Sequence, residues 1–267
     1  MDFLLETRDP TDVVTLTLNR PAVRNALDAA LVRELTTRLE TLAREPTLRL
    51  LILRGAGGTF CSGADLATMR EMADAGPEEN LAEAQRLLSL IERLDRFPTP
   101  TLAVVEGAAF GGALGLIAAC DLALATDGTR FALSEVRLGL IPALISPYVA
   151  RAMGHRPLRR YLLTGELFDA DQAQKMGLIH WVTPPESLDA TLKACVTELL
   201  KGGPHAQRVA KMLLLRLRPS FPDEVRLADE TIRLIAELRA GPEGREGLAA
   251  FLEKRRPTWR PDQTPEP

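Results

Sequence analysis

Hydrophobic positions in the first half of the chain follow two alternating spacings. Short runs of β-branched and apolar residues, bounded by Pro, Gly or Asn, predict buried strands. These runs lie at residues 13–18, 48–53, 101–105 and 121–125. Between them, apolar side chains recur every three or four positions. This spacing predicts helices that begin after the candidate N-caps Asp28 and Asp65, and a longer helix over residues 81–94. Such alternation predicts parallel strands joined by crossover helices.

The pattern changes further along the chain. Residues 107–120 predict the end of a strand, a glycine turn and a helix of small apolar residues. From residue 145 to residue 251 helical spacing prevails, with one candidate strand at residues 178–182. We therefore expect an α/β fold with a core over residues 1–200 and a helical C-terminal region over residues 201–267.

Composition narrows the class of protein. Hydrophobic residues make up 46% of the 267 positions and charged residues 26%, which is typical of globular proteins and excludes collagen, coiled coils and disordered chains. Acidic residues (36) nearly balance basic ones (33), so the charge gives no reason to expect binding to nucleic acid or to an anionic membrane. The longest apolar stretch, at residues 108–119, is too short and too rich in glycine for a membrane span.

Cysteine and histidine usage point away from disulfides and metal sites. The three cysteines (Cys61, Cys120 and Cys195) form no CxxC pair, and no signal peptide opens the chain, so we expect a reducing cytoplasm. The three histidines lie twenty-five residues apart and have no metal-ligand spacing. Phosphate-loop, dinucleotide-binding and GxSxG motifs are also missing from the sequence.

Two glycine-rich turns, at residues 59–66 and 106–115, each follow a strand and lead into a helix. Backbone N–H groups at such a turn lack helix partners and can donate to an anion. Two turns that face each other would form an oxyanion hole, although close packing of a helix on a strand would also explain the small residues.

Glu135 stands among apolar neighbours in residues 131–142. A carboxyl group in an apolar site has a raised pKa and can hold a proton near neutral pH. The alternative is an exposed glutamate that pairs with Arg137.

Taken together, these segments resemble the crotonase, or enoyl-CoA hydratase/isomerase, superfamily. The resemblance is carried by Asn19-Arg20-Pro21, Asn25-Ala26-Leu27, residues 60–66, Glu106-Gly107, Gly111-Gly112, Ala119-Cys120-Asp121, residues 134–142, residues 169–178 and residues 251–255. It implies a crotonase-type ββα spiral core with a helical C-terminal region for trimerisation, and a homotrimer or homohexamer.

The resemblance also implies a substrate and roles for named residues. The substrate would be an acyl-CoA thioester, so coenzyme A is part of the substrate and no cofactor or metal is expected. The backbone N–H groups of Ala64 and Gly112 would bind the thioester oxygen, and Glu135 would carry a proton. The residues implied in binding substrate and CoA are Arg20, Arg24, Ala26, Ser62, Gly63, Asp65, Leu66, Gly111, Gly115 and Lys254. A lysine that is common soon after the GAD motif in the family is Ala67 here.

One departure bears on the chemistry. Family hydratases carry a second glutamate three residues after the double glycine, and this chain has Gly115 there. Three interpretations follow: a hydratase with a modified water site, a 3,2-enoyl-CoA isomerase that uses Glu135 alone, or a noncatalytic protein that binds CoA esters. In the first interpretation, the candidates to hold water beside Glu135 are Asp65, Ser134, Ser146 and Tyr148.

Residues 133–149 resemble the methylglutaconyl-CoA and isohexenylglutaconyl-CoA hydratases of leucine and acyclic terpene breakdown. That subgroup also tends to have a small residue at the Gly115 position, so we place the hydratase first and the isomerase second. Such substrates carry an extra carboxylate, and Arg137 and Arg151 are the candidates to pair with it.

Overall fold

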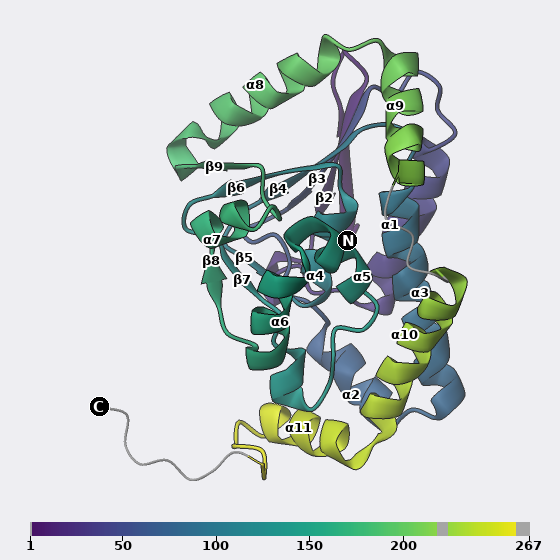
Figure 1. The fold of residues 1–267 in the computed structure, drawn as a ribbon, viewed down its shortest axis with the longest axis vertical. Coiled ribbons are helices and arrows are strands. Elements are labelled where there is room, and N and C mark those ends of the chain that lie inside the picture. The colour runs from purple at the N-terminus through teal and green to yellow at the C-terminus, as the bar shows by residue number, and fades with distance from the viewer. Residues whose placement is uncertain (1, 218–223, 260–267) are drawn as a thin grey trace.

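The computed structural model describes residues 2–217 and 224–259, and it contains two sheets (Figure 1). The larger sheet has six strands in the order β1-β2-β3-β4-β6-β9, and the smaller has three in the order β5-β7-β8. Their bounds are β1 Leu4–Arg8, β2 Val13–Leu18, β3 Leu50–Gly55, β4 Thr101–Val105, β5 Ala108–Phe110, β6 Leu122–Thr126, β7 Arg130–Ala132, β8 Phe168–Asp169 and β9 Trp181–Thr183. From β2 to β9 every pair in the large sheet is parallel, as the sequence predicts, whereas β1 runs antiparallel to β2.

Helices surround these sheets. They are α1 Ala29–Leu42, α2 Leu66–Asp74, α3 Pro77–Asp95, α4 Gly112–Ala119, α5 Ser146–Met153, α6 His155–Thr164, α7 Ala170–Lys175, α8 Leu188–Leu200, α9 Pro204–Leu217, α10 Glu224–Ala240 and α11 Pro242–Leu252, with 3-10 helices η1 Pro21–Val23, η2 Glu135–Leu138 and η3 Pro185–Ser187. Among the described residues, no helix is long and apolar enough to cross a membrane.

Alternation along the strands supplies both faces of the large sheet with apolar side chains. One set, which includes Val14, Leu51 and Ala103, packs into the main core together with α1, α3 and α4. The other set, which includes Ile52 and Val104, is covered by α8 (Figure 1). The central strands β3 and β4 are therefore buried on both faces, and their ends are held in fixed positions.

The first helices confirm the capping signals in the sequence. The Asp28 side chain accepts from the N–H of Leu31 at 2.7 Å, and the Asp65 side chain accepts from the N–H of Ala67 at 2.8 Å. Strands β1, β5, β7 and β8 are not predicted, because a strand of two or three residues has too few positions to show a period and β1 is mostly exposed. The division of the chain at residue 200 stays a prediction, and residues 218–223 and 260–267 of the C-terminal part lie outside the described residues.

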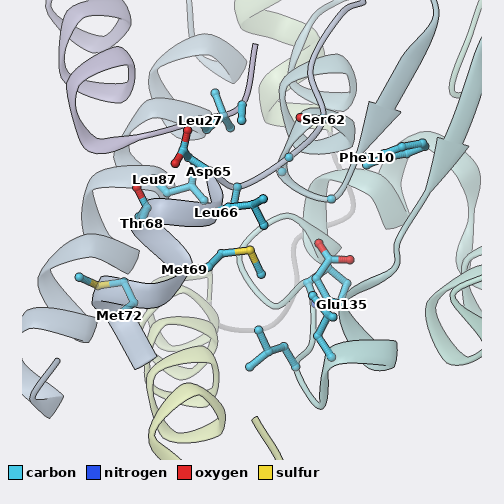
Figure 2. A pocket seen from close by; sticks show the side chains of 18 of the residues that line it. Leu27, Ser62, Asp65, Leu66, Thr68, Met69, Met72, Leu87, Phe110 and Glu135 are labelled. Carbon is cyan, nitrogen blue, oxygen red and sulfur yellow. The ribbon is translucent and has the colours of Figure 1, made fainter. Parts of the chain in front are cut away.

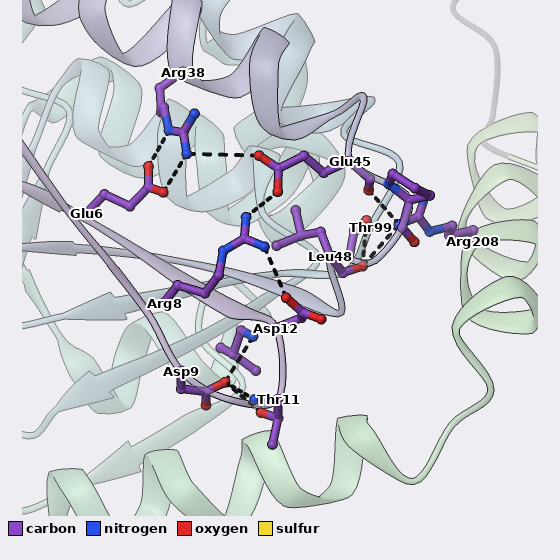
Figure 3. Close-up of polar contacts among 12 residues, drawn as sticks. Glu6, Arg8, Asp9, Thr11, Asp12, Arg38, Glu45, Leu48, Thr99 and Arg208 are labelled. Atoms are coloured by element: carbon purple, nitrogen blue, oxygen red, sulfur yellow. Dashed lines mark hydrogen bonds and ion pairs between the residues drawn. The ribbon is translucent and has the colours of Figure 1, made fainter.

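Helix α9 is fixed to the core by polar contacts at two levels. Arg208 donates to the carbonyl oxygens of Glu45, Pro46 and Leu48 at 3.0–3.2 Å (Figure 3). One turn further along, the buried Lys211 Nζ lies 2.6 Å from the Asp121 carboxylate. These contacts hold one side of α9 against the core, while Val209, Leu213 and other apolar side chains of the helix are exposed.

Candidate active site

A cavity of about 680 Å³ lies where the segments after several strands meet helices from the C-terminal part (Figure 2). Leucine, isoleucine and methionine side chains make up much of its lining. The polar side chains in that lining are Arg24, Ser62, Asp65, Thr68, Glu83, Ser134, Glu135 and Arg239. An apolar cavity with a few polar groups is the usual form of a small-molecule site.

The first glycine-rich turn presents the N–H of Ala64. Gly63 has φ +93°, and a Cβ there would lie 2.9 Å from the Phe110 carbonyl oxygen, so the turn requires glycine. Leu27 pairs with this turn, donating to the Gly63 carbonyl at 2.7 Å and accepting from the Asp65 N–H at 3.0 Å. Within residues 2–217 and 224–259, no backbone carbonyl accepts from the Ala64 N–H.

The second turn presents the N–H of Gly112. Gly111 has φ +52° and ψ −121°, a conformation that favours glycine, and it directly precedes the first residue of α4. The Gly111 N–H is used by the Ala132 carbonyl at 2.9 Å, whereas no carbonyl in the described part of the chain accepts from Gly112. Cys61 and β5 join the two turns through a pair of hydrogen bonds of 3.1 Å each. Two free backbone donors thus line one cavity.

Glu135 opens η2, with two residues between it and the end of β7, and Figure 2 shows its carboxyl group on the opposite side of the cavity from Met69. Its Oε2 atom is buried, and no described residue donates a hydrogen bond to it. Burial disfavours the charged form and raises the pKa of Glu135 to about 7. A Cβ at Gly111 would lie 2.7 Å from Glu135 Oε1, so the missing side chain is what lets the carboxyl group approach the turn.

The other two carboxylates of the lining are already occupied. Asp65 caps α2 and lies 3.0 Å from the Arg20 guanidinium, and Glu83 lies 2.5 Å from Arg239. Among the described residues that line the cavity, Glu135 is therefore the one carboxyl group without an ion pair. A carboxyl group with a pKa near neutral, beside two free N–H donors, can move a proton on a substrate whose oxygen those donors hold.

Comparison with known proteins decides the family. Residues 8–262 match the family model described as enoyl-CoA hydratase/isomerase. The chain belongs to the enoyl-CoA hydratase/isomerase family. It is 34% identical to the enoyl-CoA hydratase ACTT6 of Alternaria alternata (89% of this chain, 78% of that protein) and 34% identical to the enoyl-CoA isomerase/hydratase fer4 of Mycosarcoma maydis (93% of each).

A solved structure of an enoyl-CoA hydratase from Shewanella pealeana has 43% sequence identity and a TM-score of 0.79. The similarity covers 97% of this chain and 96% of that one. The crotonase-type α/β fold that the motifs predict is confirmed.

Most of the residues that the family motifs imply for the site line the cavity. They are Arg24, Ala26, Ser62, Gly63, Ala64, Asp65, Leu66, Gly111, Gly112 and Glu135. Arg20, Gly115 and Lys254 do not line it. Arg20 is held in ion pairs of 3.0 Å with Asp28 and Asp65, and Lys254 is exposed just after α11.

Gly115, at the position of the second family glutamate, is buried inside α4. A Cβ there would lie 2.3 Å from Ile145 Cγ2 and 3.2 Å from Ile91 Cδ1. The structure thus places Gly115 at a close contact between helices rather than on the cavity wall.

The residues expected to assist Glu135 are spread over several places. Ser134 lines the cavity, but Ser146 Oγ donates to the Pro142 carbonyl at 2.7 Å, and Tyr148 lines a separate cavity of about 540 Å³. Arg151 lines that second cavity too, and Arg137 is exposed and donates to the Thr164 carbonyl at 3.3 Å.

No motif in the sequence predicts the helical side of the cavity. Its side chains come from α2, α3, α10 and α11, and they include Met69, Met72, Glu83, Leu87, Ile235, Arg239, Leu248 and Phe251. Helical periodicity marks many of them as buried, but no local motif shows that helices some 150 residues apart share a cavity.

Proposed function

We propose that this family member adds water to the double bond of a 2-enoyl-CoA thioester, with Glu135 as the group that moves the proton. The observation that carries the proposal is the buried carboxyl group of Glu135, without a hydrogen-bond partner on Oε2 among the described residues, in one cavity with the free N–H groups of Ala64 and Gly112. Coenzyme A enters as part of the substrate, and the reaction needs no further cofactor.

In the proposed reaction the thioester oxygen accepts hydrogen bonds from Ala64 and Gly112. As water attacks the β carbon, charge moves onto that oxygen, and each donor of this type contributes about 3 kcal/mol to stabilising the enolate. Glu135 takes a proton from the water as the carbon–oxygen bond forms and delivers a proton to the α carbon. The elements of one water molecule are added, and Glu135 returns to its starting state. Ser134, the hydroxyl next to Glu135 in the lining, is the candidate to orient the water.

The isomerase is the second candidate, and the packing of Gly115 favours it. Ile145 packs against Gly115, and α4 contains no carboxylate that could face Glu135. One carboxylate suffices to take a proton from the α carbon of a 3-enoyl-CoA and return it to the γ carbon, which moves the double bond without adding atoms. A noncatalytic role fits less well, because a buried carboxyl group without a partner is costly unless it has a use.

The substrate class that we propose first is a branched or carboxylated enoyl-CoA such as methylglutaconyl-CoA, on the resemblance of residues 133–149. Arg24 lines the cavity and is exposed, so it is free to approach the CoA phosphates.

Cys61, Cys120 and Cys195 are free thiols, in keeping with a cytoplasmic enzyme.

We further propose that the C-terminal helices assemble the chain into a homotrimer or homohexamer. On α9, Leu213, Leu214 and Leu217 are 54%, 65% and 67% exposed, although Ile232 and Ile235 of α10 are buried within the chain. Lys254, which does not line the cavity of its own chain, would then reach CoA bound to a neighbour. Light scattering should give a multiple of three of the 29.2 kDa chain, and a 29 kDa particle at micromolar concentration would contradict the assembly.

The function is tested by offering the purified protein crotonyl-CoA, 3-methylglutaconyl-CoA and 3-hexenoyl-CoA and identifying the products by mass and retention. A hydrated product supports the lyase, and a product of unchanged mass from 3-hexenoyl-CoA supports the isomerase. Glu135→Gln should lower turnover about 10²- to 10⁴-fold while CoA-ester binding persists.

Glu106→Gln is the matched control, because Glu106 pairs with Arg54 and does not line the cavity. It should leave turnover near that of the unchanged protein. Binding of all three esters without conversion of any would contradict the proposed function.

A further inference from the structure

An ion pair forms part of the mostly apolar helical side of the cavity. Glu83 of α3 and Arg239 of α10 both line the cavity, and Arg239 Nη1 lies 2.5 Å from Glu83 Oε2. The two side chains are 16% and 13% exposed, so the pair is largely shielded from bulk water. One turn along each helix lie apolar lining residues, Leu87 on α3 and Ile235 on α10.

The pair does not use all the donors of the arginine. A guanidinium carries five N–H groups, and the Glu83 carboxylate is the one partner that the described residues give to Arg239. None of its nitrogens is among the described buried atoms that lack a partner. The remaining N–H donors of Arg239 therefore stay accessible. Because Arg239 lines the cavity, these donors can face a ligand bound there.

The free donors of Arg239 favour a ligand that offers them a hydrogen-bond acceptor. An alkyl chain packed on Arg239 would strip water from those donors and give nothing in return, which is unfavourable. An oxygen atom at the same place would accept from the guanidinium and replace the lost water. Glu83 already balances one charge of Arg239, so a neutral oxygen and a carboxylate are both chemically acceptable partners.

We infer that Arg239, held by Glu83, makes the cavity select acyl groups that carry a hydrogen-bond-accepting oxygen beyond the reacting carbons over plain alkyl chains of the same length. The inference rests on the proposed function only in that the cavity receives the acyl group of a CoA ester. Arg239 is then a specificity-determining residue and takes no part in proton transfer.

Binding of saturated CoA esters tests this without turnover. Titration calorimetry would compare octanoyl-CoA with two esters of equal backbone length, 7-carboxyheptanoyl-CoA and its methyl ester. The same comparison would be made with acyl chains of six and ten carbons. We expect one or both oxygenated esters to bind about 10-fold more tightly than the alkyl ester at the chain length that reaches Arg239. The two oxygenated arms show whether a carboxylate or a neutral oxygen is preferred.

Variants of Arg239 and Glu83 then test whether this ion pair causes the preference for oxygenated esters. Arg239→Met should abolish it and strengthen binding of the alkyl ester, while Arg239→Lys keeps a charged donor and should retain part of it. Glu83→Gln leaves Arg239 unbalanced and should move the preference toward the carboxylate about 10-fold. Arg151→Met is the matched control, because Arg151 is also a half-buried arginine that pairs with α3, through Asp95 at 3.4 Å, but does not line this cavity.

Equal or tighter binding of the alkyl ester at every length, in the unchanged protein, would overturn the inference. So would a folded Arg239→Met protein that keeps the preference. A protein that converts no enoyl-CoA but still binds the oxygenated esters more tightly would contradict the proposed reaction and leave the role of Arg239 standing.

Discussion

The sheet side and the helical side of the cavity are built in different ways. On the sheet side, backbone N–H groups at Ala64 and Gly112 are fixed by hydrogen bonds between neighbouring turns, and one side chain, Glu135, supplies the chemistry. On the helical side, the surface consists of side chains from four helices, with Glu83 and Arg239 as half-buried charges. The backbone donors and Glu135 determine which reaction the site can catalyse. The side chains of the helices determine which acyl groups fit, and they can vary without altering the backbone donors.

Two glycines of one segment show the same contrast on a smaller scale. Gly111 is needed at the site, since a Cβ would meet the Glu135 carboxyl group, and Gly115 is needed for packing, since a Cβ would meet Ile145. Both belong to the same glycine-rich motif, and their roles differ only in which neighbour each one faces.

Gly111→Ala should produce the largest effect. Gly111 has a positive φ that strains any residue with a side chain, and the new Cβ would lie 2.7 Å from Glu135 Oε1. The substitution should therefore displace both the carboxyl group and the Gly112 N–H. Loss of one oxyanion donor lowers kcat about 10²- to 10³-fold, and we expect at least that loss in steady-state kinetics.

Gly58→Ala is the control for that variant. Gly58 also has a positive φ, of +69°, but a Cβ there meets nothing within 4 Å. It should strain the loop and keep turnover. Normal turnover in Gly111→Ala would show that this turn does not form the site.

The pH dependence of kcat/KM should follow Glu135. The group that accepts a proton must be ionised, and burial raises its pKa to about 7. Below that pH, kcat/KM should fall about tenfold per pH unit, and above it the profile should level off. A profile that is flat between pH 5 and pH 9, or that falls as the pH rises through 7, would contradict the role of Glu135.

Glu135 should also make the folded protein less stable at high pH. Its pKa is about 7 in the folded chain against an ordinary value of 4.5, so between these values the folded state binds more protons than the unfolded state. The free energy of unfolding should therefore fall as the pH rises through this window, by up to about 3 kcal/mol.

Glu135→Gln removes this dependence. Urea denaturation should show the variant gaining stability relative to the unchanged protein at pH 8 but not at pH 4.5. An identical change between the two pH values in both proteins would mean that Glu135 does not titrate as a buried group.

Gly115→Ala should have the smallest effect on activity and a clear effect on stability. The added methyl group would lie 2.3 Å from Ile145 Cγ2, and overpacking of this kind costs about 1–3 kcal/mol. Gly128→Ala, whose Cβ would meet nothing within 4 Å, is the control and should change stability little.

Activity per folded molecule of Gly115→Ala should stay within a few-fold of normal. Gly115→Glu should unfold more easily still and should not increase hydration of crotonyl-CoA. A folded Gly115→Glu protein with increased hydration would instead show that the position faces the substrate.

The sequence predicts the sheet side of the site far better than the helical side. The turns around Gly63 and Gly111 follow strands and open helices, so local signals place their free N–H groups, and the apolar surroundings of Glu135 predict its raised pKa. What Gly115 contacts and how Glu83 meets Arg239 depend on helix packing between distant segments, which no local pattern records. The short strands β5, β7 and β8 are missed for a related reason, because pairing with a neighbouring strand rather than propensity makes them.

Exchange of the α protons of butyryl-CoA in D₂O tests the central claim most directly, because it requires only the enolate, the two N–H donors and Glu135. By proton NMR, the unchanged protein should replace these protons with deuterium. Glu135→Gln should slow the exchange at least 100-fold while it binds butyryl-CoA with similar affinity. Equal exchange rates in the two proteins, at equal occupancy, would contradict the account.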